Sequence, residues 1–161
     1  MSSATRTPEA AETPPAMETP PGAWIGAVLD GVVAAVAMAV AMAVLMPGAL
    51  EQAIPALYGQ TGGAFGLTAH LAHGAVLGLV FAAIVRFGGL TEYTDSVTRS
   101  ALLGAAYGVA LWIVTGSFVL PAWLSAVGVP MAVPTFSGAS LITHLVYGIV
   151  LGALYPWAKR Y

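Results

Sequence analysis

A chain of 161 residues has room for one domain, and 58% apolar against 7% charged residues leaves too little polar surface for a water-soluble protein. A formal net charge of −2 with five Lys and Arg residues excludes a basic surface for nucleic acid. The absence of cysteine excludes disulfides and thiolate metal sites. Because lipid cannot satisfy backbone polar groups, and the long apolar runs lack the alternation of barrel strands, we expect an all-α polytopic membrane protein.

The chain divides into a polar start and four apolar runs. The start is rich in Pro, Thr, Ala and Glu without apolar periodicity, so we expect residues 1–22 to form a disordered cytoplasmic tail and residues 23–161 a four-helix transmembrane domain. Each run has about the 20 residues that cross a bilayer core of roughly 30 Å. Pro47 and Pro121 are expected to end the first and third helices. The predicted spans are residues 23–46, 67–87, 100–120 and 138–157.

The positive charges outside the apolar runs all fall on one side of the predicted membrane. They are Arg6, Arg86, Arg99, Lys159 and Arg160. The other two connections, residues 47–66 and 121–137, contain no Lys or Arg. The positive-inside rule therefore predicts a multi-pass protein of the plasma membrane with both termini in the cytoplasm. Both connections are long, so they are expected to fold back onto the bilayer surface or to cap the bundle, and loops of this length are usually either functional or partly helical.

The sequence repeats itself at a shift of 74 residues. This shift aligns residues 47–78 with 121–152 without a gap, and 10 of the 32 aligned positions are identical. The match is densest between HLAHGAVLG (70–78) and HLVYGIVLG (144–152). Gly26 and Gly104 also align if the first helix is one turn longer. We therefore expect two tandem two-helix repeats related by a parallel pseudo-twofold axis along the membrane normal, because a unit that crosses twice keeps its orientation.

Two predicted helices carry a histidine on the same stripe as two glycines. His70 in the second helix and His144 in the fourth each begin a series at four-residue spacing. Glycines at this GxxxG spacing let helices pack closely, so both imidazoles should face a neighbouring helix. The glycines of these faces, and of a third face in the third predicted helix, are Gly74, Gly78, Gly104, Gly108, Gly148 and Gly152.

Two matched histidines in a four-helix bundle are the geometry of b-type haem ligation, or of part of a copper or zinc site. The alternative is a structural role, in which each ring donates a hydrogen bond across a helix interface to a backbone carbonyl or a side chain. The side chains considered are Thr68, Thr143 and Tyr147. The structural role is favoured because no second metal-ligand motif is present. His73, whose repeat partner is Tyr147, would be a third or supporting ligand, or would face the headgroups.

Asp30 is the only acidic residue inside a predicted span, about two turns from the cytoplasmic end of the first helix. An ionisable group in a span predicts an ion or proton site. An ion pair with Arg86 or Arg99, or hydration from the interface, is the favoured interpretation because Asp30 is shallow for a midplane site. The first helix also carries methionines at four-residue spacing, which indicate either a copper path or lipid-facing and core filler. They are Met38, Met42 and Met46.

The repeated H-L-x-x-G-x-x-L-G pattern, four spans, a short acidic tail rich in Pro, Thr and Glu and scarce lysine resemble small uncharacterised four-span membrane proteins of halophilic archaea. The resemblance covers residues 23–157. Because that family has no known function, the resemblance implies the fold and no activity.

Three functions remain open, and none is an enzyme, because no nucleophile elbow, P-loop or dinucleotide fingerprint occurs. The preferred one is a non-enzymatic accessory or assembly subunit of a larger membrane complex, such as a respiratory one. Such a subunit would contact the lipid bilayer and either a membrane-protein partner or further copies of itself in a homo-oligomer. The second is an electron carrier that binds haem or a metal through His70 and His144. The third is a small transporter or channel lined by Asp30 and the histidines.

Overall fold

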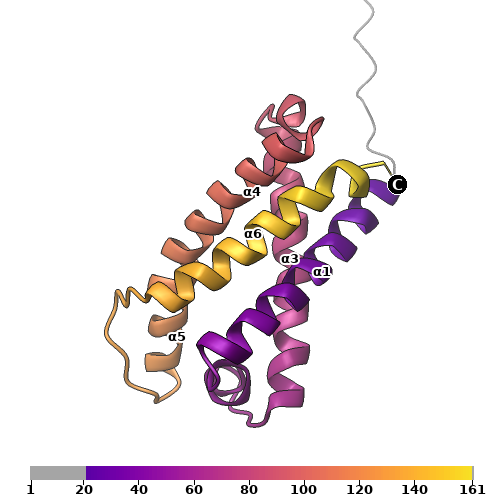
Figure 1. The fold of residues 1–161 in the computed structure, drawn as a ribbon. Coiled ribbons are helices and arrows are strands. Elements are labelled where there is room, and N and C mark those ends of the chain that lie inside the picture. The colour runs from indigo at the N-terminus through magenta and orange to yellow at the C-terminus, as the bar shows by residue number, and fades with distance from the viewer. Residues whose placement is uncertain (1–20, 161) are drawn as a thin grey trace, which may run out of the picture.

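The computed structural model describes residues 21–160, and all regular structure in that part of the chain is helical (Figure 1). Four of the described helices are long and apolar enough to cross a membrane, which confirms the predicted number of spans and the all-α class. They are α1 (Pro21–Leu45), α3 (Gly63–Phe87), the continuous helix formed by α4 (Val97–Leu111), η3 (Trp112–Val119) and α5 (Leu120–Ala126), and α6 (Gly138–Ala158). The predicted tail falls almost wholly outside the described residues, so its disorder stays a prediction.

The third span differs most from its predicted bounds. Pro47 follows the end of α1, as predicted, but Pro121 does not end the third helix, which continues to Ala126. The reason is the π-helical segment η3, in which Leu120 N–H donates to the carbonyl of Thr115 five residues earlier. Proline normally clashes with the carbonyl four residues before it, and the wider π turn relieves that clash.

The first long connection is partly helical, which is one of the alternatives that its length suggested. A π-helical turn η1 (Ala49–Ala53) and a short α2 (Ile54–Ala56) follow α1. The turn lies directly on the start of α3, because a Cβ added to Gly66 would overlap the carbonyl oxygen of Leu50. Gly59 and Gly62 have positive φ angles of 63° and 94°, which let the chain reverse into α3. The second long connection is likewise partly helical, since it begins with α5.

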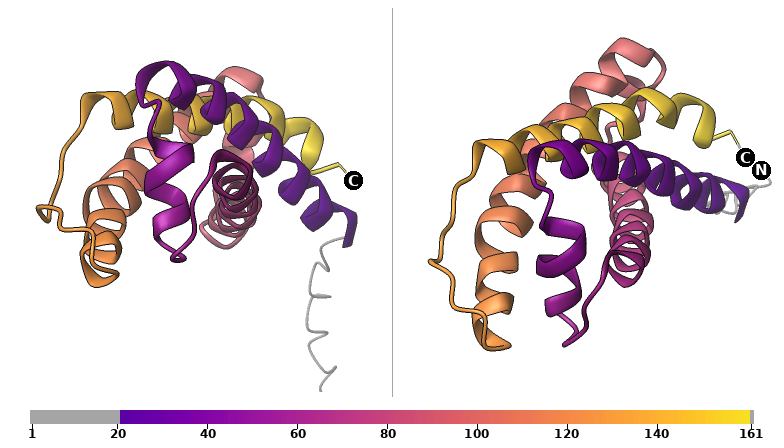
Figure 2. Two further views of the ribbon diagram at one scale, coloured as in Figure 1. Left: turned by 90° about the horizontal axis from the view of Figure 1, so that it is seen from below. Right: turned by 60° about the horizontal axis from the view of Figure 1, so that its bottom comes forward.

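The four spanning helices form two close pairs. α1 packs against α3 and α4 against α6, while α1 and α6 run side by side between the outer helices (Figures 1 and 2). A Cβ on Gly104 of α4 would lie 2.8 Å from Gly152 Cα, closer than real Cβ atoms come. Gly31 of α1 makes the matching approach to Gly78 Cα, at 3.0 Å. The backbones of each pair are therefore in direct contact.

The proposed alignment of Gly26 with Gly104 is wrong. Gly26 lies against the backbone of Ala158 in α6, whereas Gly104 lies against α6 glycines one to three turns earlier. Gly31 is the α1 residue that contacts its partner helix as Gly104 does. The alignment has the wrong register. Gly26 and Gly31 are both separated from Gly104 by nearly the repeat length, and only their packing shows that Gly31 is the equivalent residue.

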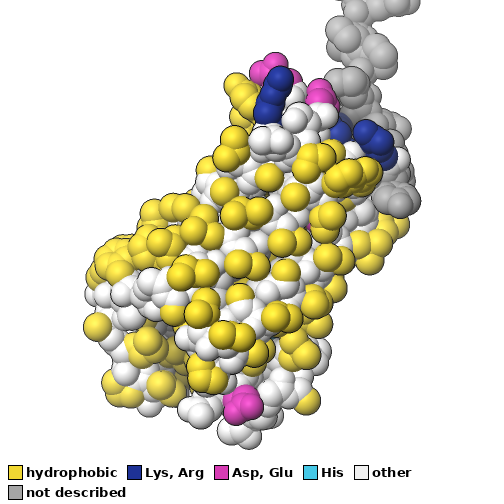
Figure 3. All heavy atoms as spheres, viewed as in Figure 1, with side chains coloured by type: hydrophobic (Ala, Val, Ile, Leu, Met, Phe, Trp, Pro, Cys, Tyr) yellow, Lys and Arg dark blue, Asp and Glu magenta, His cyan; other side chains and the backbone are white. Residues whose placement is uncertain are grey.

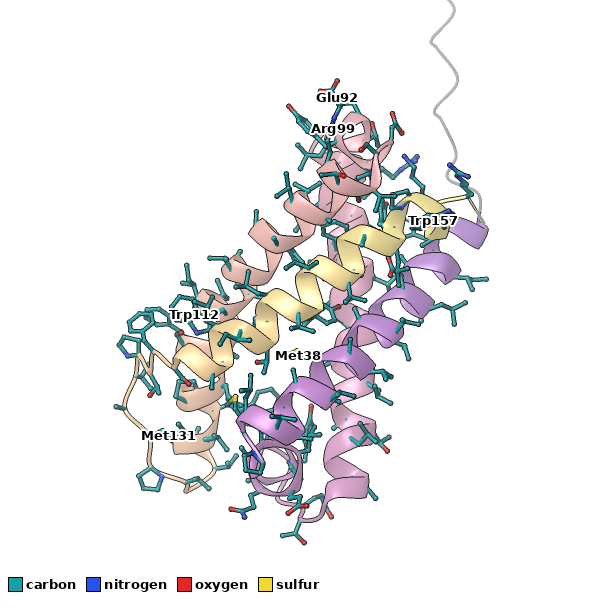
Figure 4. The ribbon with its side chains drawn as sticks, in the orientation of Figure 1. Met38, Glu92, Arg99, Trp112, Met131 and Trp157 are labelled. Atoms are coloured by element: carbon teal, nitrogen blue, oxygen red, sulfur yellow. The ribbon has the colours of Figure 1, made fainter. Side chains whose placement is uncertain are left out.

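Charged side chains gather at one end of the bundle, which we call the charged end. A short 3-10 helix η2 (Thr91–Thr94) joins α3 to α4 there. Figure 3 shows acidic and basic groups together at this end, and Figure 4 places Glu92, Arg99 and Trp157 there. Lys159 Nζ donates to Asp95 Oδ1 at 2.7 Å and to Thr94 Oγ1 at 2.9 Å, which ties the end of α6 to this connection. The hydrogen bond and positive charge of Lys159 hold the pKa of Asp95 below its usual value.

Large apolar side chains cover the outside of the helices. Figure 3 shows them spread over the visible face between the two ends. Exposed examples occur on all four spans, among them Val40, Val76, Leu102 and Ile149. In water this surface would be unstable, and in a bilayer it is the surface expected to contact lipid tails.

Candidate functional site

A cavity of about 340 Å³, which we call the chamber, lies toward the end opposite the charged end. Its walls come from α1, the first connection, α3, the η3–α5 part of the third span, and α6. All three histidines of the chain line it, together with Met38 and Met42 of α1 and Met46 directly after that helix. The structure thus brings together two groups that the sequence presents separately: His70, His73 and His144 with Met38, Met42 and Met46.

His70 is buried between α3 and α1. Its Nε2 lies 3.0 Å from the carbonyl oxygen of Ala35 in α1. A carbonyl oxygen only accepts, so Nε2 carries the hydrogen, and in the neutral ring Nδ1 keeps its lone pair. This is the interhelical bond to a backbone carbonyl that the structural interpretation of His70 describes.

His144 is held in the opposite tautomer. Its Nδ1 lies 2.7 Å from the carbonyl oxygen of Ser140 one turn earlier in α6, so Nδ1–H donates and Nε2 keeps the lone pair. Thr115 Oγ1 lies 3.4 Å from that Nε2, but it donates its hydrogen to Leu111 O at 2.6 Å. Nε2 therefore remains able to accept a hydrogen bond. Gly116 makes room for the ring, because an added Cβ would lie 3.1 Å from His144 Cε1.

The side chains proposed as partners for the two histidines bond elsewhere. The hydroxyl groups of Thr68 and Thr143 donate to carbonyls of their own helices, those of Ala64 and Ser140. Tyr147 OH donates to the carbonyl of Gly74 across the bundle at 2.8 Å. Tyr147 is buried and lines the chamber. It therefore connects α6 to α3 rather than holding a histidine.

His73 belongs to an aromatic group with Tyr58 of the first connection and Trp123 of α5. Its Nε2 lies 2.5 Å from the hydroxyl oxygen of Tyr58, and the two rings stack with centroids 6.0 Å apart. Tyr58 also meets Trp123 of α5 edge to face at 5.6 Å. These contacts join the first connection to the end of the third span beside the chamber. His73 therefore has a side-chain partner of its own, which the sequence did not indicate.

The histidines do not form a conventional metal centre. Within residues 21–160, no three His, Asp or Glu side chains lie close enough together to hold a metal ion. Symmetric haem ligation through both Nε2 atoms would also require His70 to give up its bond to Ala35. An electron carrier that binds haem or a metal through His70 and His144 therefore stays a prediction. Haem binding of this kind would require the hydrogen bond between His70 and Ala35 to break.

Asp30 lies outside the chamber and is 5% exposed. Neither of its carboxyl oxygens has a hydrogen-bond partner among residues 21–160, so the expected ion pair with Arg86 or Arg99 was wrong. Depth explains the difference. Asp30 is nine residues after Pro21, about 13 Å of helix rise, whereas Arg86 is in the last turn of α3 and Arg99 in the first turn of α4.

The π-helical segment η3 is the part of the site that the sequence reasoning missed. Thr115 and Gly116 of this segment both line the chamber beside His144. π-Helical turns inside α-helices occur frequently at functional sites. The available signal was the run Thr115–Ser117, three weakly helix-forming residues in the middle of an apolar span.

Comparison of the chain with protein-family models, with curated proteins and with solved structures finds no significant match.

Proposed function

We propose that this protein binds a small, largely apolar molecule bearing hydroxyl groups in the chamber, and that it does so without catalysing a reaction. The observation that carries this proposal is the fixed tautomer of two chamber histidines. Ala35 O and Ser140 O each take the N–H of one ring, so His70 and His144 offer lone pairs rather than hydrogens. A hydroxyl group is the neutral donor that complements such a nitrogen.

The size and lining of the chamber support an organic ligand. Ligand pockets typically measure about 300–1,000 Å³, and this one is near the lower limit. Most of its wall is aliphatic, thioether or aromatic, with a few polar groups that converge from different helices. A mainly apolar ligand with one or two polar positions fits this composition, and it would reach the chamber from the lipid phase.

The test compares 4-bromophenol with bromobenzene, which differ only in the hydroxyl group. Both quench tryptophan fluorescence, and the signal of Trp123 in the chamber wall is obtained by difference from a Trp123→Phe variant in nanodiscs. One hydrogen bond contributes about 1 kcal/mol, so we expect bromophenol to bind about fivefold more tightly.

The variant His144→Phe should weaken this preference for the phenol, because it removes one of the two acceptor nitrogens. Ile142→Phe places the same new side chain on the exposed face of α6 and should leave the preference unchanged. Equal binding of both probes to the wild type would contradict hydroxyl recognition. Quenching that never saturates would contradict a binding site in the chamber.

A second candidate is Cu(I), and the position of the α1 methionines favours it. Met38 and Met42 are buried and line the chamber, so they do not face lipid. Thioether and imidazole ligands together suit Cu(I). Competition with a coloured Cu(I) chelator should show one retained copper that Met42→Leu weakens and Met131→Leu, in the second connection, does not. Equal retention by both variants would exclude a methionine site.

We infer that the two helix pairs are tandem copies of one unit, and that glycine-rich faces hold together the two helices within each pair. Gly31 meets Gly74 and Gly78 much as Gly104 meets Gly148 and Gly152, which supports a common origin of the pairs. Such copies would be related by an axis along the membrane normal.

The charged end would lie in the cytoplasm of a plasma-membrane protein, in line with the positive-inside rule. The chain has no cysteine, so single cysteines can be introduced cleanly. A Glu51→Cys variant should react with an impermeant maleimide on intact cells, and Glu92→Cys should react only after permeabilisation. The reverse pattern would invert the topology.

The role of accessory or assembly subunit stays a prediction. Its support was the set of glycine-rich faces, and the structure uses these faces inside the chain. A partner would therefore bind the lipid-facing surface instead. Crosslinking in membranes followed by purification tests this role: a reproducible larger complex would support it, and an isolated monomer would count against it.

A further inference from the structure

Asp30 is the strongest unexplained feature outside the chamber. Its side chain is 95% buried in the bundle, and neither oxygen has a hydrogen-bond donor among residues 21–160. An ionised carboxylate in this setting would be both desolvated and unpaired, which proteins avoid. The carboxyl group must therefore bind a proton or a cation that neutralises its charge.

Two cavities lie on either side of this carboxyl group. The chamber includes Tyr147 in its wall. A second hollow of about 180 Å³ at the charged end includes Tyr155, Arg86 and Lys159. In α1 the hollow is lined by Ala23 and Trp24 and the chamber by residues from Met38 onward, so Asp30 lies between the two along the helix. The carboxyl group is thus between the two cavities, with one tyrosine toward each.

The tyrosine on the chamber side is already engaged. Tyr147 OH donates to Gly74 O at 2.8 Å, and the neighbouring Tyr107 OH donates to Leu77 O at 2.8 Å. No such hydrogen bond holds the hydroxyl of Tyr155 within the described residues. Tyr155 is therefore the group better placed to exchange a hydrogen between the hollow and Asp30.

We propose that Asp30 is a proton-binding site that stays protonated at neutral pH and exchanges its proton with the charged-end hollow by way of Tyr155. Besides the chamber histidines, the ionisable side chains on the helices packed around α1 are Tyr147 and Tyr155 of α6 and Arg86 of α3, with Tyr107 of α4 beyond them. None of these donates a hydrogen bond to the carboxyl. A proton removes the buried charge with no further ligand, whereas a hard metal cation needs several oxygen ligands.

This site does not depend on the ligand proposed for the chamber. The proton that Asp30 binds comes from water in the hollow, passes through the Tyr155 hydroxyl, and returns the same way. No bond other than O–H bonds forms or breaks. The hollow has Arg86 and Lys159 in its wall, so it suits polar occupants such as water.

Infrared spectroscopy of the full chain in lipid tests the site directly. At neutral pH we expect a protonated carboxyl C=O band that disappears in Asp30→Asn and persists in the matched loop variant Glu51→Gln. Asp30→Glu should keep a carboxyl band at a shifted frequency, which assigns it even if the asparagine variant folds poorly. A wild-type spectrum without this band would show an ionised Asp30 and overturn the proposal.

Hydrogen–deuterium exchange of the same band tests the route. After transfer to D₂O the band should shift, and Tyr155→Phe should slow the shift at least tenfold. Tyr147→Phe should leave the rate within twofold of wild type, since Tyr147 faces the chamber. A Tyr155→Phe rate equal to wild type, or a slowing confined to Tyr147→Phe, would refute exchange through the charged-end hollow.

Discussion

Replacing Gly148 by alanine should separate α4 from α6. The added Cβ would overlap the carbonyl oxygen of Gly104 and lie 2.9 Å from both Cα and N of Gly108. All of these are backbone atoms, so no side chain can rotate away and the helices themselves must move. Overpacking of this kind costs about 3 kcal/mol at the upper end of its range. Alanine returns about 1 kcal/mol of helix propensity, which leaves a net loss of about 2 kcal/mol.

The loss can be measured by unfolding the protein reversibly in mixed micelles with increasing dodecyl sulfate, followed by circular dichroism. A loss of about 2 kcal/mol lowers the folding equilibrium constant roughly thirtyfold. The matched control is Gly138→Ala in the first turn of α6, where an added Cβ meets nothing within 4 Å. If Gly148→Ala were as stable as Gly138→Ala, the backbones of α4 and α6 would not be in contact here and the reasoning would fail.

Three further predictions concern other parts of the fold. Ser100 is fully buried, and its hydroxyl has no hydrogen-bond partner among residues 21–160, so Ser100→Ala should raise the unfolding free energy by about 1 kcal/mol in the same assay. Asp95 should titrate by NMR below its usual pKa of about 4, and Lys159→Met should restore the usual value. Because the folded pKa is lowered, this ion pair is complete above the usual pKa and is lost as pH falls through the lowered one. Gly116→Val should fill the space beside His144, and saturable bromophenol quenching of the chamber should disappear.

Hydropathy and proline placement predict most of this fold, but not the third span. The apolar runs give the four crossings because the bilayer fixes how many apolar residues a crossing helix needs. Pro47 and Pro121 look equivalent in sequence, yet only Pro47 follows a helix end. The difference depends on η3, and a π-helical turn has no hydrophobic period that distinguishes it from α-helix in a uniformly apolar segment.

The candidate site shows the same division between what spacing predicts and what packing decides. Four-residue spacing correctly places His70 and the glycines on one buried stripe. Spacing cannot identify the hydrogen-bond partners of the histidine rings. The partner of His70 is Ala35 O in another helix, and the partner of His73 is Tyr58 in a connection. The isolation of Asp30 is likewise a result of packing. Counting along the chain gives its depth, but only the fold shows that neither Arg86 nor Arg99 reaches it.

The contacts between the two helix pairs explain why the chamber forms where it does. At the charged end α1 and α6 touch backbone to backbone, since Gly26 lies against Ala158. Toward the opposite end, Met38 of α1 and Tyr147 of α6 line the cavity, and the hydroxyl of Tyr147 reaches across to the carbonyl of Gly74.

At the chamber end, Met38 and Tyr147 thus hold the two helix pairs apart. At the charged end, glycine lets the pairs touch. Under the proposed function a ligand would therefore occupy the end of the bundle where Tyr58 of the first connection meets Trp123 of α5. If the two helix pairs are repeats, as we propose, the boundary between them is also where repeat-built transporters place their substrate site. The chamber lies at that boundary, whereas the glycine contacts within each pair leave no space for a ligand.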